Sequence, residues 1–309
     1  MNPDWVIGGG GLLGSAIRRA VTHTWATRVR WDDADTAEAD LRHAVDTFVA
    51  QPGPLRIYWC AGKGVTATPA AELAREITTF HAFLDALRGQ DAARTTVFLA
   101  SSVGGAYAAA TAPPFTERTS ARAASAYGEA KLDMERSLSA WTESTGGRAV
   151  IGRITNLYGP GQDVSKAQGL ISVALRSYLT GAPATIFVSL DTLRDYLFVD
   201  DGAAIAVAAT RRAEAGEAGC ATLKILGYGT AVSVGAVLGE IARLRRTRAP
   251  IVLAGGGQGG QAPDLRVRST VWTDLDALAT TTLPAGIQRT YDRMLRDFAC
   301  GTARTPTGP

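Results

Sequence analysis

The sequence predicts an α/β fold, with a doubly wound parallel sheet and a smaller C-terminal α/β domain. Short apolar runs alternate with amphipathic helical stretches through the first half of the chain, as in parallel sheets whose strands are joined by helices. The chain opens on a strand, a glycine turn and a helix. Small and polar residues follow the apolar runs, and ligands of such folds bind at the carboxyl ends of the strands.

Composition bounds the class of protein. The chain has 309 residues, of which 46% are hydrophobic and 20% charged, and its net charge is +3. This near-neutral balance argues against nucleic acid or an anionic membrane as the main partner. Cys60, Cys220 and Cys300 lie far apart, without metal-ligand spacing. No apolar run approaches the roughly 20 residues of a membrane-spanning helix, and the N-terminus offers no signal peptide. We therefore expect a cytoplasmic protein with no metal site.

The opening stretch carries glycines in the spacing G-x-x-G-x-x-G, at Gly8, Gly11 and Gly14. Gly8 would let the strand turn into the helix, Gly11 would let the backbone approach a pyrophosphate, and Gly14 would let the helix pack closely on the strand. The helix N-terminus would then bind the phosphates. This pattern is typical of a Rossmann dinucleotide site, although a flexible glycine-rich loop is the alternative.

An acid after the second strand bears on the choice of cofactor. We expect a helix over residues 15–23 and a strand over residues 27–31, which ends on Asp32. A carboxylate there can accept hydrogen bonds from the adenosine ribose and would repel a 2′-phosphate, so NAD is favoured over NADP. Arg28 and Arg30 lie close by and leave NADP possible. The alternative for Asp32 is a solvated loop acid.

The later elements follow from the same periodicities. Further helices are expected at residues 36–50, 69–88, 123–141, 165–178 and 233–244, and further strands at residues 55–60, 95–100, 150–153, 184–188 and 222–226. Asp200 and Asp201 are expected to cap a helix that begins at Ala203. Residues 254–261 are expected to be a glycine-rich connection. Residues 1–160 would form the dinucleotide-binding domain, completed by about residues 190–230, and residues 161–309 would mainly bind substrate.

A tyrosine and a lysine stand four residues apart in one predicted helix. Tyr127 and Lys131 would share a face of that helix, where the lysine cation favours the phenolate form of the tyrosine. Ser102, at the end of the preceding strand, can hydrogen-bond the same substrate oxygen, and Ser101 is the alternative for that role. Such a trio can move a proton to or from a hydroxyl or carbonyl. Alone, the tyrosine–lysine spacing is common on ordinary helix surfaces.

Together these motifs resemble an extended short-chain dehydrogenase/reductase of the NAD-dependent epimerase/dehydratase group, which acts on nucleotide sugars. The resemblance covers nearly the whole chain. It rests on the glycine fingerprint, Asp32, the strand end at Ala61 and Gly62, Ser101 and Ser102 before Tyr107, Tyr127-x-x-x-Lys131, the stretch at residues 153–161 and the stretch at residues 194–201.

The resemblance implies a role for each site residue. Tyr127 would be the catalytic acid/base, Lys131 would bind the nicotinamide ribose, and Ser102 would hold the reacting oxygen. Asn156 would face the substrate. The cofactor-binding residues would be Gly8, Gly11, Leu12, Leu13, Gly14, Asp32, Ala61, Gly62, Lys63, Tyr127, Lys131 and Ile154.

The resemblance also implies the diphosphate contacts and the assembly. Arg194 and Arg266 would bind the substrate diphosphate, which suits guanidinium groups. The alternative for Arg194 is a salt bridge to Asp195 or Asp200. The helices at residues 69–88 and 123–141 would pair with those of a second copy, which gives a homodimer.

The chain departs from the family pattern in three places. The region between Asp32 and Leu55 is too short for the usual extra strand, which puts the adenine pocket in doubt. The serine loop is one residue longer before Tyr107 than the common epimerase form. Val103 and Gly104 stand where sugar 4,6-dehydratases carry an Asp-Glu pair, so water elimination would lack its proton shuttle.

These observations predict an NAD-dependent nucleotide-sugar 4-epimerase that works through a transient 4-keto sugar. The alternative is an NAD(P)H-dependent 4-ketoreductase of a nucleotide-activated sugar, which would use the same serine, tyrosine and lysine. A non-catalytic NAD(P)-binding protein is disfavoured, because Tyr127 and Lys131 are both present.

Overall fold

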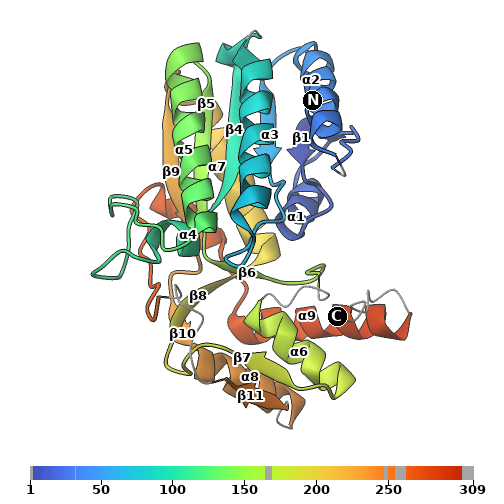
Figure 1. Ribbon diagram of the computed structural model, residues 1–309, viewed down its shortest axis with the longest axis vertical. Coiled ribbons are helices and arrows are strands. Elements are labelled where there is room, and N and C mark those ends of the chain that lie inside the picture. The colour runs from blue at the N-terminus through green and yellow to red at the C-terminus, as the bar shows by residue number, and fades with distance from the viewer. Residues whose placement is uncertain are drawn as a thin grey trace.

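Six parallel strands form the main sheet of the protein. The computed structural model describes residues 3–31, 33–88, 90–163, 169–246, 250–254 and 262–300. The strand order is β2-β1-β3-β4-β5-β9 (Figure 1). The strands are β1 (Asp4–Ile7), β2 (Thr24–Trp25), β3 (Leu55–Trp59), β4 (Thr95–Ser102), β5 (Arg148–Ile154) and β9 (Ala221–Leu226). The predicted doubly wound parallel sheet is confirmed.

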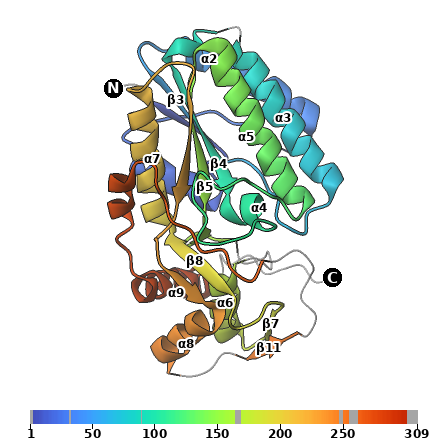
Figure 2. The same cartoon turned by 90° about the vertical axis from the view of Figure 1, so that its left-hand side faces the viewer.

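Helices cover both faces of this sheet. On one face α1 (Leu12–Ala20) packs against α7 (Val199–Glu214). On the other face lie α2 (Ala34–Val49), α3 (Ala70–Arg88) and α5 (Ala126–Thr145), with α3 between its two neighbours. Figure 2 shows β3, β4 and β5 between α7 and the α3–α5 pair. The layers therefore follow the three-layer plan of a doubly wound fold.

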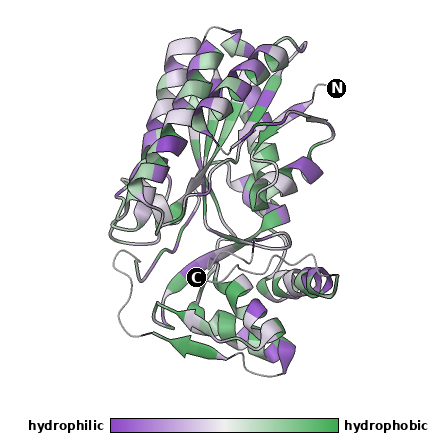
Figure 3. Ribbon diagram, turned by 45° about the vertical axis from the view of Figure 1, so that its right-hand side comes forward, coloured by the Kyte–Doolittle hydropathy of each residue, from purple (hydrophilic) through white to green (hydrophobic). Residues whose placement is uncertain are grey.

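Successive side chains of the strands point to opposite faces of the sheet and pack in two separate hydrophobic cores. Ile57 and Trp59 of β3 pack on the side of α2, α3 and α5, whereas Tyr58 between them packs on the side of α1 and α7. A strand buried on both faces reads as a continuous apolar run, as the sequence of β3 does. In Figure 3 hydrophobic residues gather on the strands of the main sheet, whereas the surrounding helices mix hydrophobic and hydrophilic residues.

The strand order places a crevice at β1 and β3. The chain runs from β1 to its neighbour β2, then crosses back over the other face through α2 to reach β3 on the opposite side of β1. At such a reversal the connections diverge from the two central strands, and a ligand can bind beyond their carboxyl ends. The glycine turn follows β1 at this point.

The second strand is shorter and lies earlier than expected. A strand over residues 27–31 was predicted, but β2 covers only Thr24–Trp25, which pairs with Asp4 and Trp5. Residues 26–31 have no regular structure. Val29 packs against the cluster around Trp5 without strand pairing, whereas Trp31 is exposed. Asp32 lies outside the described residues, and Asp33 caps α2 by accepting a hydrogen bond from the Thr36 amide at 2.9 Å.

The C-terminal part builds two small sheets below the main one (Figure 1). A three-stranded sheet has the order β10-β8-β6, and β7 pairs with β11. These strands are β6 (Asn156–Tyr158), β7 (Ala184–Ile186), β8 (Leu193–Phe198), β10 (Ala231–Ser233) and β11 (Ile251–Leu253). The helices here are α6 (Leu170–Thr180), α8 (Val234–Arg245) and α9 (Leu283–Ala299). They bury a cluster of their own, while the expected domain boundaries stay a prediction.

Two expectations for this half need correction. The predicted helix at Ala203 begins at Val199, so Asp200 and Asp201 lie in its first turn and do not cap it. Asp200 instead forms an ion pair with Arg19 of α1 at 2.7 Å. Asp201 is buried and accepts hydrogen bonds from the backbone amide and hydroxyl of Thr281. Both acids hold α7 to other parts of the chain.

Two further segments fall partly outside the described residues. The helix expected over residues 165–178 is seen from Leu170 onward as α6, and residues 164–168 are not described. Of the glycine-rich stretch at residues 254–261, only Ala254 is described.

Candidate active site

The glycine turn after β1 is closed by contacts that exclude side chains. Gly8 has φ of +80°, and a Cβ there would lie 2.5 Å from the backbone nitrogen of Ala61. A Cβ on Gly14 would lie 2.3 Å from the Gly8 carbonyl oxygen. A Cβ on Gly11 would meet no protein atom closer than 3.4 Å. The fold therefore needs Gly8 and Gly14 for its own packing, whereas Gly11 borders space that the protein leaves open.

The N-terminus of α1 is suited to an anion. No side chain caps this helix, and its first turn holds no acid. The Leu13 side chain is buried in the core on the α7 side, and Leu12 packs against the same core. The backbone N–H groups of this first turn are thus free of a side-chain cap and could face a phosphate, in the field of the positive helix end.

The loop after β3 lies between the glycine turn and α5. Lys63 is exposed, and its backbone amide donates to Glu76 of α3 at 2.5 Å. The Gly64 amide donates to the same carboxylate at 2.9 Å, and a Cβ on Gly64 would lie 3.5 Å from the Tyr127 ring. Gly62 has φ of +136°. Glu76 thus holds this loop beside Tyr127. Nothing in the sequence distinguishes it from the surface acids of the same helix.

Tyr127 and Lys131 extend from α5 toward the ends of the strands. The Lys131 Nζ lies 5.8 Å from the centroid of the Tyr127 ring and donates to the carbonyl of Ala100 on β4 at 3.3 Å. Lys131 therefore bridges α5 and the carboxyl end of β4. The phenol and the ammonium share one helical face, as their spacing predicts.

The two serines at the end of β4 have different partners. The buried Ser101 hydroxyl donates to Glu135 of α5 at 2.5 Å. Ser102 is half-buried, and its hydroxyl caps the short helix α4 (Val103–Tyr107) by accepting from the Gly105 amide at 3.0 Å. A Cβ on Gly105 would lie 3.3 Å from the Ser102 Cβ and 3.4 Å from the Tyr127 ring. Ser102 and the Tyr127 ring thus both lie beside Gly105, whereas the Ser101 hydroxyl is bound to Glu135.

A buried ion pair lies directly behind this trio. Arg153 of β5 binds Glu135 through Nε and Nη2, the latter at 2.6 Å, and its Nη1 donates to the Tyr107 hydroxyl at 2.7 Å. Burial lowers the pKa of Arg153, but the bonds to Glu135 and Tyr107 raise it above its ordinary value overall. Sequence reasoning named Tyr107 and Arg153 only as parts of motifs and missed Glu135. The available signal was its position two turns after Tyr127 on the same helical face.

Ile154, predicted to bind the cofactor, and the predicted substrate residues Asn156 and Arg266 lie near the junction of the two halves. Ile154 is buried at the end of β5 and pairs in register with Ser102. Asn156 is exposed on β6, and its side-chain amide donates to the Asp195 carbonyl at 3.0 Å. Arg266 is exposed and forms an ion pair with Asp264 at 2.7 Å. A ligand could use the Arg266 guanidinium only by competing with that carboxylate.

Arg194 is the buried cation of this junction. It is 8% exposed and donates to the carbonyl of Leu193 at 2.8 Å. Burial lowers its pKa below the ordinary value. Neither proposed salt-bridge partner is available, because Asp200 pairs with Arg19 and Asp195 accepts from the Thr155 hydroxyl and the amides at 228 and 229. Within the described residues no carboxylate hydrogen-bonds this guanidinium.

Comparison with known proteins then decides the family. The protein-family model described as "NAD dependent epimerase/dehydratase family" matches residues 5–222 of this chain. The chain belongs to this family. The predicted enzyme class and the predicted cofactor, NAD, agree with this NAD-dependent family.

Curated members match over shorter stretches. A dTDP-4-dehydro-6-deoxyglucose reductase of Escherichia coli is 30% identical over 34% of this chain and 33% of its own length. A dTDP-L-rhamnose 4-epimerase of Burkholderia thailandensis is 31% identical over 40% of this chain and 33% of its own. A dTDP-glucose 4,6-dehydratase of Salmonella typhimurium is 31% identical over 35% and 29%. The chain spans about a third of the length of the curated relatives it matches.

Solved structures of the family share the fold over nearly the whole chain. UDP-glucose 4-epimerase of Thermotoga maritima, solved with UDP-glucose, has a TM-score of 0.80 at 17% identity and covers 96% of this chain and 99% of its own. MoeE5, in complex with UDP-glucose and NAD, has a TM-score of 0.78 at 22% identity with the same coverage.

The residues of this family member fit a dinucleotide. A Cβ at Gly11 would make only an ordinary van der Waals contact, with the Gly8 carbonyl oxygen, and no side chain makes a capping hydrogen bond at the N-terminus of α1. Among the described residues no group of three or more His, Cys, Asp or Glu is placed to hold a metal ion. Over the same residues no helix is long and apolar enough to cross a membrane.

Proposed function

We propose that this protein is an NAD-dependent nucleotide-sugar 4-epimerase that works through a transient 4-keto sugar. One observation carries the proposal. Ser102, Tyr127 and Lys131 gather at the carboxyl ends of the strands, and the loop held by Glu76 links them to the glycine turn. The residues proposed to transfer the proton thus lie beside the glycine turn that would bind the dinucleotide.

The chemistry assigned to the chain is proton transfer and orientation. NAD, when bound, supplies hydride acceptance and return at the sugar C4. Tyr127 as the phenolate takes the proton of the C4 hydroxyl, while Ser102 donates a hydrogen bond to the same oxygen. When the keto sugar has turned its other face, Tyr127 returns the proton and the C4 configuration is inverted. Lys131, whose Nζ lies 5.8 Å from the centroid of the Tyr127 ring, would bind the nicotinamide ribose beside it.

Dehydration is disfavoured by the chain itself. Val103 is 2% exposed and packs in the cluster around Tyr107 and Phe115, and Gly104 has no side chain. A 4,6-elimination would need an acid to protonate the leaving hydroxyl, and neither position offers one.

The second candidate is a 4-ketoreductase, which the match to the E. coli dTDP-4-dehydro-6-deoxyglucose reductase favours. A 4-epimerase regenerates its cofactor in each cycle and keeps it bound, whereas a reductase exchanges it. The nucleotide released by denaturing the purified protein discriminates between them. Stoichiometric NAD supports the epimerase, whereas an empty protein that consumes NADH or NADPH with a 4-keto sugar nucleotide supports the reductase.

We propose that Arg194 binds the diphosphate of the substrate. An Arg194→Met variant is expected to bind UDP about tenfold or more weakly, since charge-assisted hydrogen bonds contribute roughly 1.5–3 kcal/mol. Its unfolding temperature should not fall, because the variant removes a buried cation that no carboxylate of the described residues hydrogen-bonds. Calorimetric titration with UDP and a thermal melt measure the two effects. Arg293→Met on α9 is the control and should change neither. A lower melting temperature with unchanged UDP affinity would show a structural role instead.

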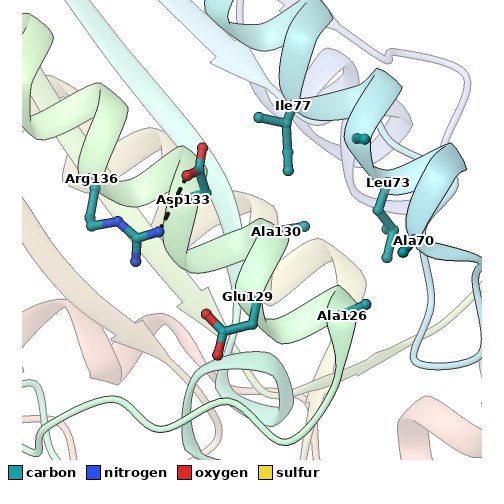
Figure 4. A pocket seen from close by; sticks show the side chains of 9 residues that line it. Ala70, Leu73, Ile77, Ala126, Glu129, Ala130, Asp133 and Arg136 are labelled. Atoms are coloured by element: carbon teal, nitrogen blue, oxygen red, sulfur yellow. Dashed lines mark hydrogen bonds and ion pairs between the residues drawn. The ribbon is translucent and has the colours of Figure 1, made fainter.

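We further propose a homodimer through α3 and α5. A groove between these helices is lined by Ala70, Leu73 and Ile77 on one side and by Ala126 and Ala130 on the other, with Glu129, Asp133 and Arg136 along its rim (Figure 4). Small residues on both helices allow a second pair of helices to approach closely. Ala70 and Ala126 are exposed in this groove and Ile77 is half-buried.

An Ile77→Asp variant tests this interface. The added charge would be buried without a partner in the dimer, so light scattering is expected to give a dimer for the natural sequence and a monomer for the variant. Leu295→Asp on α9 introduces the same charge at an exposed apolar position outside this groove and should leave the dimer intact. A natural sequence that scatters as a monomer would overturn the proposal.

A further inference from the structure

The adenosine end of the cofactor site has an unusual wall in this chain. The edge strand β2 has two residues, residues 26–31 after it have no regular structure, and α2 begins at Ala34. No further strand lies beyond β2 within the part of the chain that the structure describes. The backbone that would extend the sheet on the adenosine side is therefore replaced by one irregular segment.

A tryptophan stands at the end of that segment. Trp31 is 40% exposed, although tryptophan is usually well buried. Its ring meets Trp59 edge-on, with centroids 6.4 Å apart and planes at 86°. Trp59 ends β3 and pairs in register with Ile7, the residue before the Gly8 turn. The Trp31 ring thus lies at the same strand ends as the turn that receives the pyrophosphate.

The surroundings hold this ring in place. Trp59 is buried and packs against Phe80 and Phe83 of α3 at 4.9 and 4.8 Å between centroids. The residue before Trp31 is fixed as well, because the Arg30 amide and guanidinium both bind Asp40 of α2, at 2.9 and 2.7 Å. An exposed ring that is held on a rigid base loses little conformational entropy when a flat ligand covers it.

We infer that Trp31 stacks on the adenine of NAD and supplies the contact that the missing strand would otherwise make. The inference depends on NAD as the cofactor and holds for either proposed reaction. An indole face is a suitable surface for a purine, and the exposed fraction of Trp31 is then covered only in the complex.

The inference is tested by comparing two ligands that contain adenosine, NAD and ADP-ribose, with one that does not, UDP. NAD, ADP-ribose and UDP are titrated calorimetrically into the natural protein, freed of nucleotide, and into Trp31→Ala, Trp31→Phe and Trp272→Phe. Trp31→Ala should bind NAD and ADP-ribose about tenfold more weakly, within the range that stacking on one base supports. Its affinity for UDP should not change. Trp31→Phe keeps an aromatic face and should lose less. Trp272, which packs beside α7, is the control and should change nothing.

Each alternative result has a distinct meaning. Equal affinity of Trp31→Ala and the natural protein for ADP-ribose would overturn the role of Trp31 and leave the proposed function intact. A loss of UDP affinity equal to the loss of NAD affinity would show that Trp31 only maintains the fold, which also overturns it. A natural protein that binds UDP but neither NAD nor ADP-ribose would overturn the proposed function together with this inference.

Discussion

A Tyr127→Phe variant is expected to lose turnover by a factor of about 10² to 10⁴, the range that a positioned general acid/base contributes. The phenylalanine ring keeps the contacts that Tyr127 makes beside Gly64 and Gly105, so only the hydroxyl is removed. Without it, the oxygen proposed to accept the proton of the sugar hydroxyl is gone. The substrate for the assay is the UDP or dTDP sugar that most raises the unfolding temperature.

Binding measurements separate this loss from misfolding. Tyr127→Phe should bind NAD and UDP as the natural protein does, because the glycine turn after β1 and Arg194 are unchanged. Tyr291→Phe on α9, under the guanidinium of Arg245, is the matched control and should keep full turnover. Unchanged turnover in Tyr127→Phe would overturn the proposed mechanism outright, whatever the sugar.

Local chemistry explains why the glycine turn and the group of Ser102, Tyr127 and Lys131 could be predicted from the sequence. A strand that must turn into a helix within a few residues needs glycine where a Cβ would strike Ala61, and Gly8 meets that need within a short stretch of chain. Likewise, a spacing of four residues places Tyr127 and Lys131 on one face of any helix. Both signals depend on neighbours in sequence, so no tertiary information was required.

Contacts between distant segments explain what the sequence did not predict. The apolar residues between 27 and 31 alternate like those of a strand, but Val29 packs against the core without strand pairing. Asp201 looks like a helix cap until Thr281, far along the chain, is seen to donate to it. Glu76 and Glu135 read as surface acids of amphipathic helices. Their roles depend on a loop and a strand that only the fold brings beside them.

The buried pair behind the trio gives the largest expected effect on stability. A Glu135→Ala variant is expected to lower the free energy of unfolding by about 3–5 kcal/mol, the cost of leaving a buried charge without its partner. Glu135 and Arg153 are each 6% exposed, so water cannot take the place of the lost carboxylate. Ser101 would lose its acceptor at the same time. Urea unfolding, with the midpoint and slope fitted together, measures the change.

A double replacement distinguishes the pair from its packing. Glu135→Leu combined with Arg153→Met removes both charges and keeps apolar volume, so it should cost clearly less than the sum of the single changes. Asp85→Ala, which breaks the exposed pair with Arg88 on α3, is the control and should cost less than about 1 kcal/mol. If the losses of unfolding free energy from the single changes at 135 and 153 simply add up in the double variant, the two side chains stabilise the protein independently. Because Glu135 joins α5 to the end of β4, the single variant should also reduce turnover where it still folds, by loosening Tyr127 relative to Ser102.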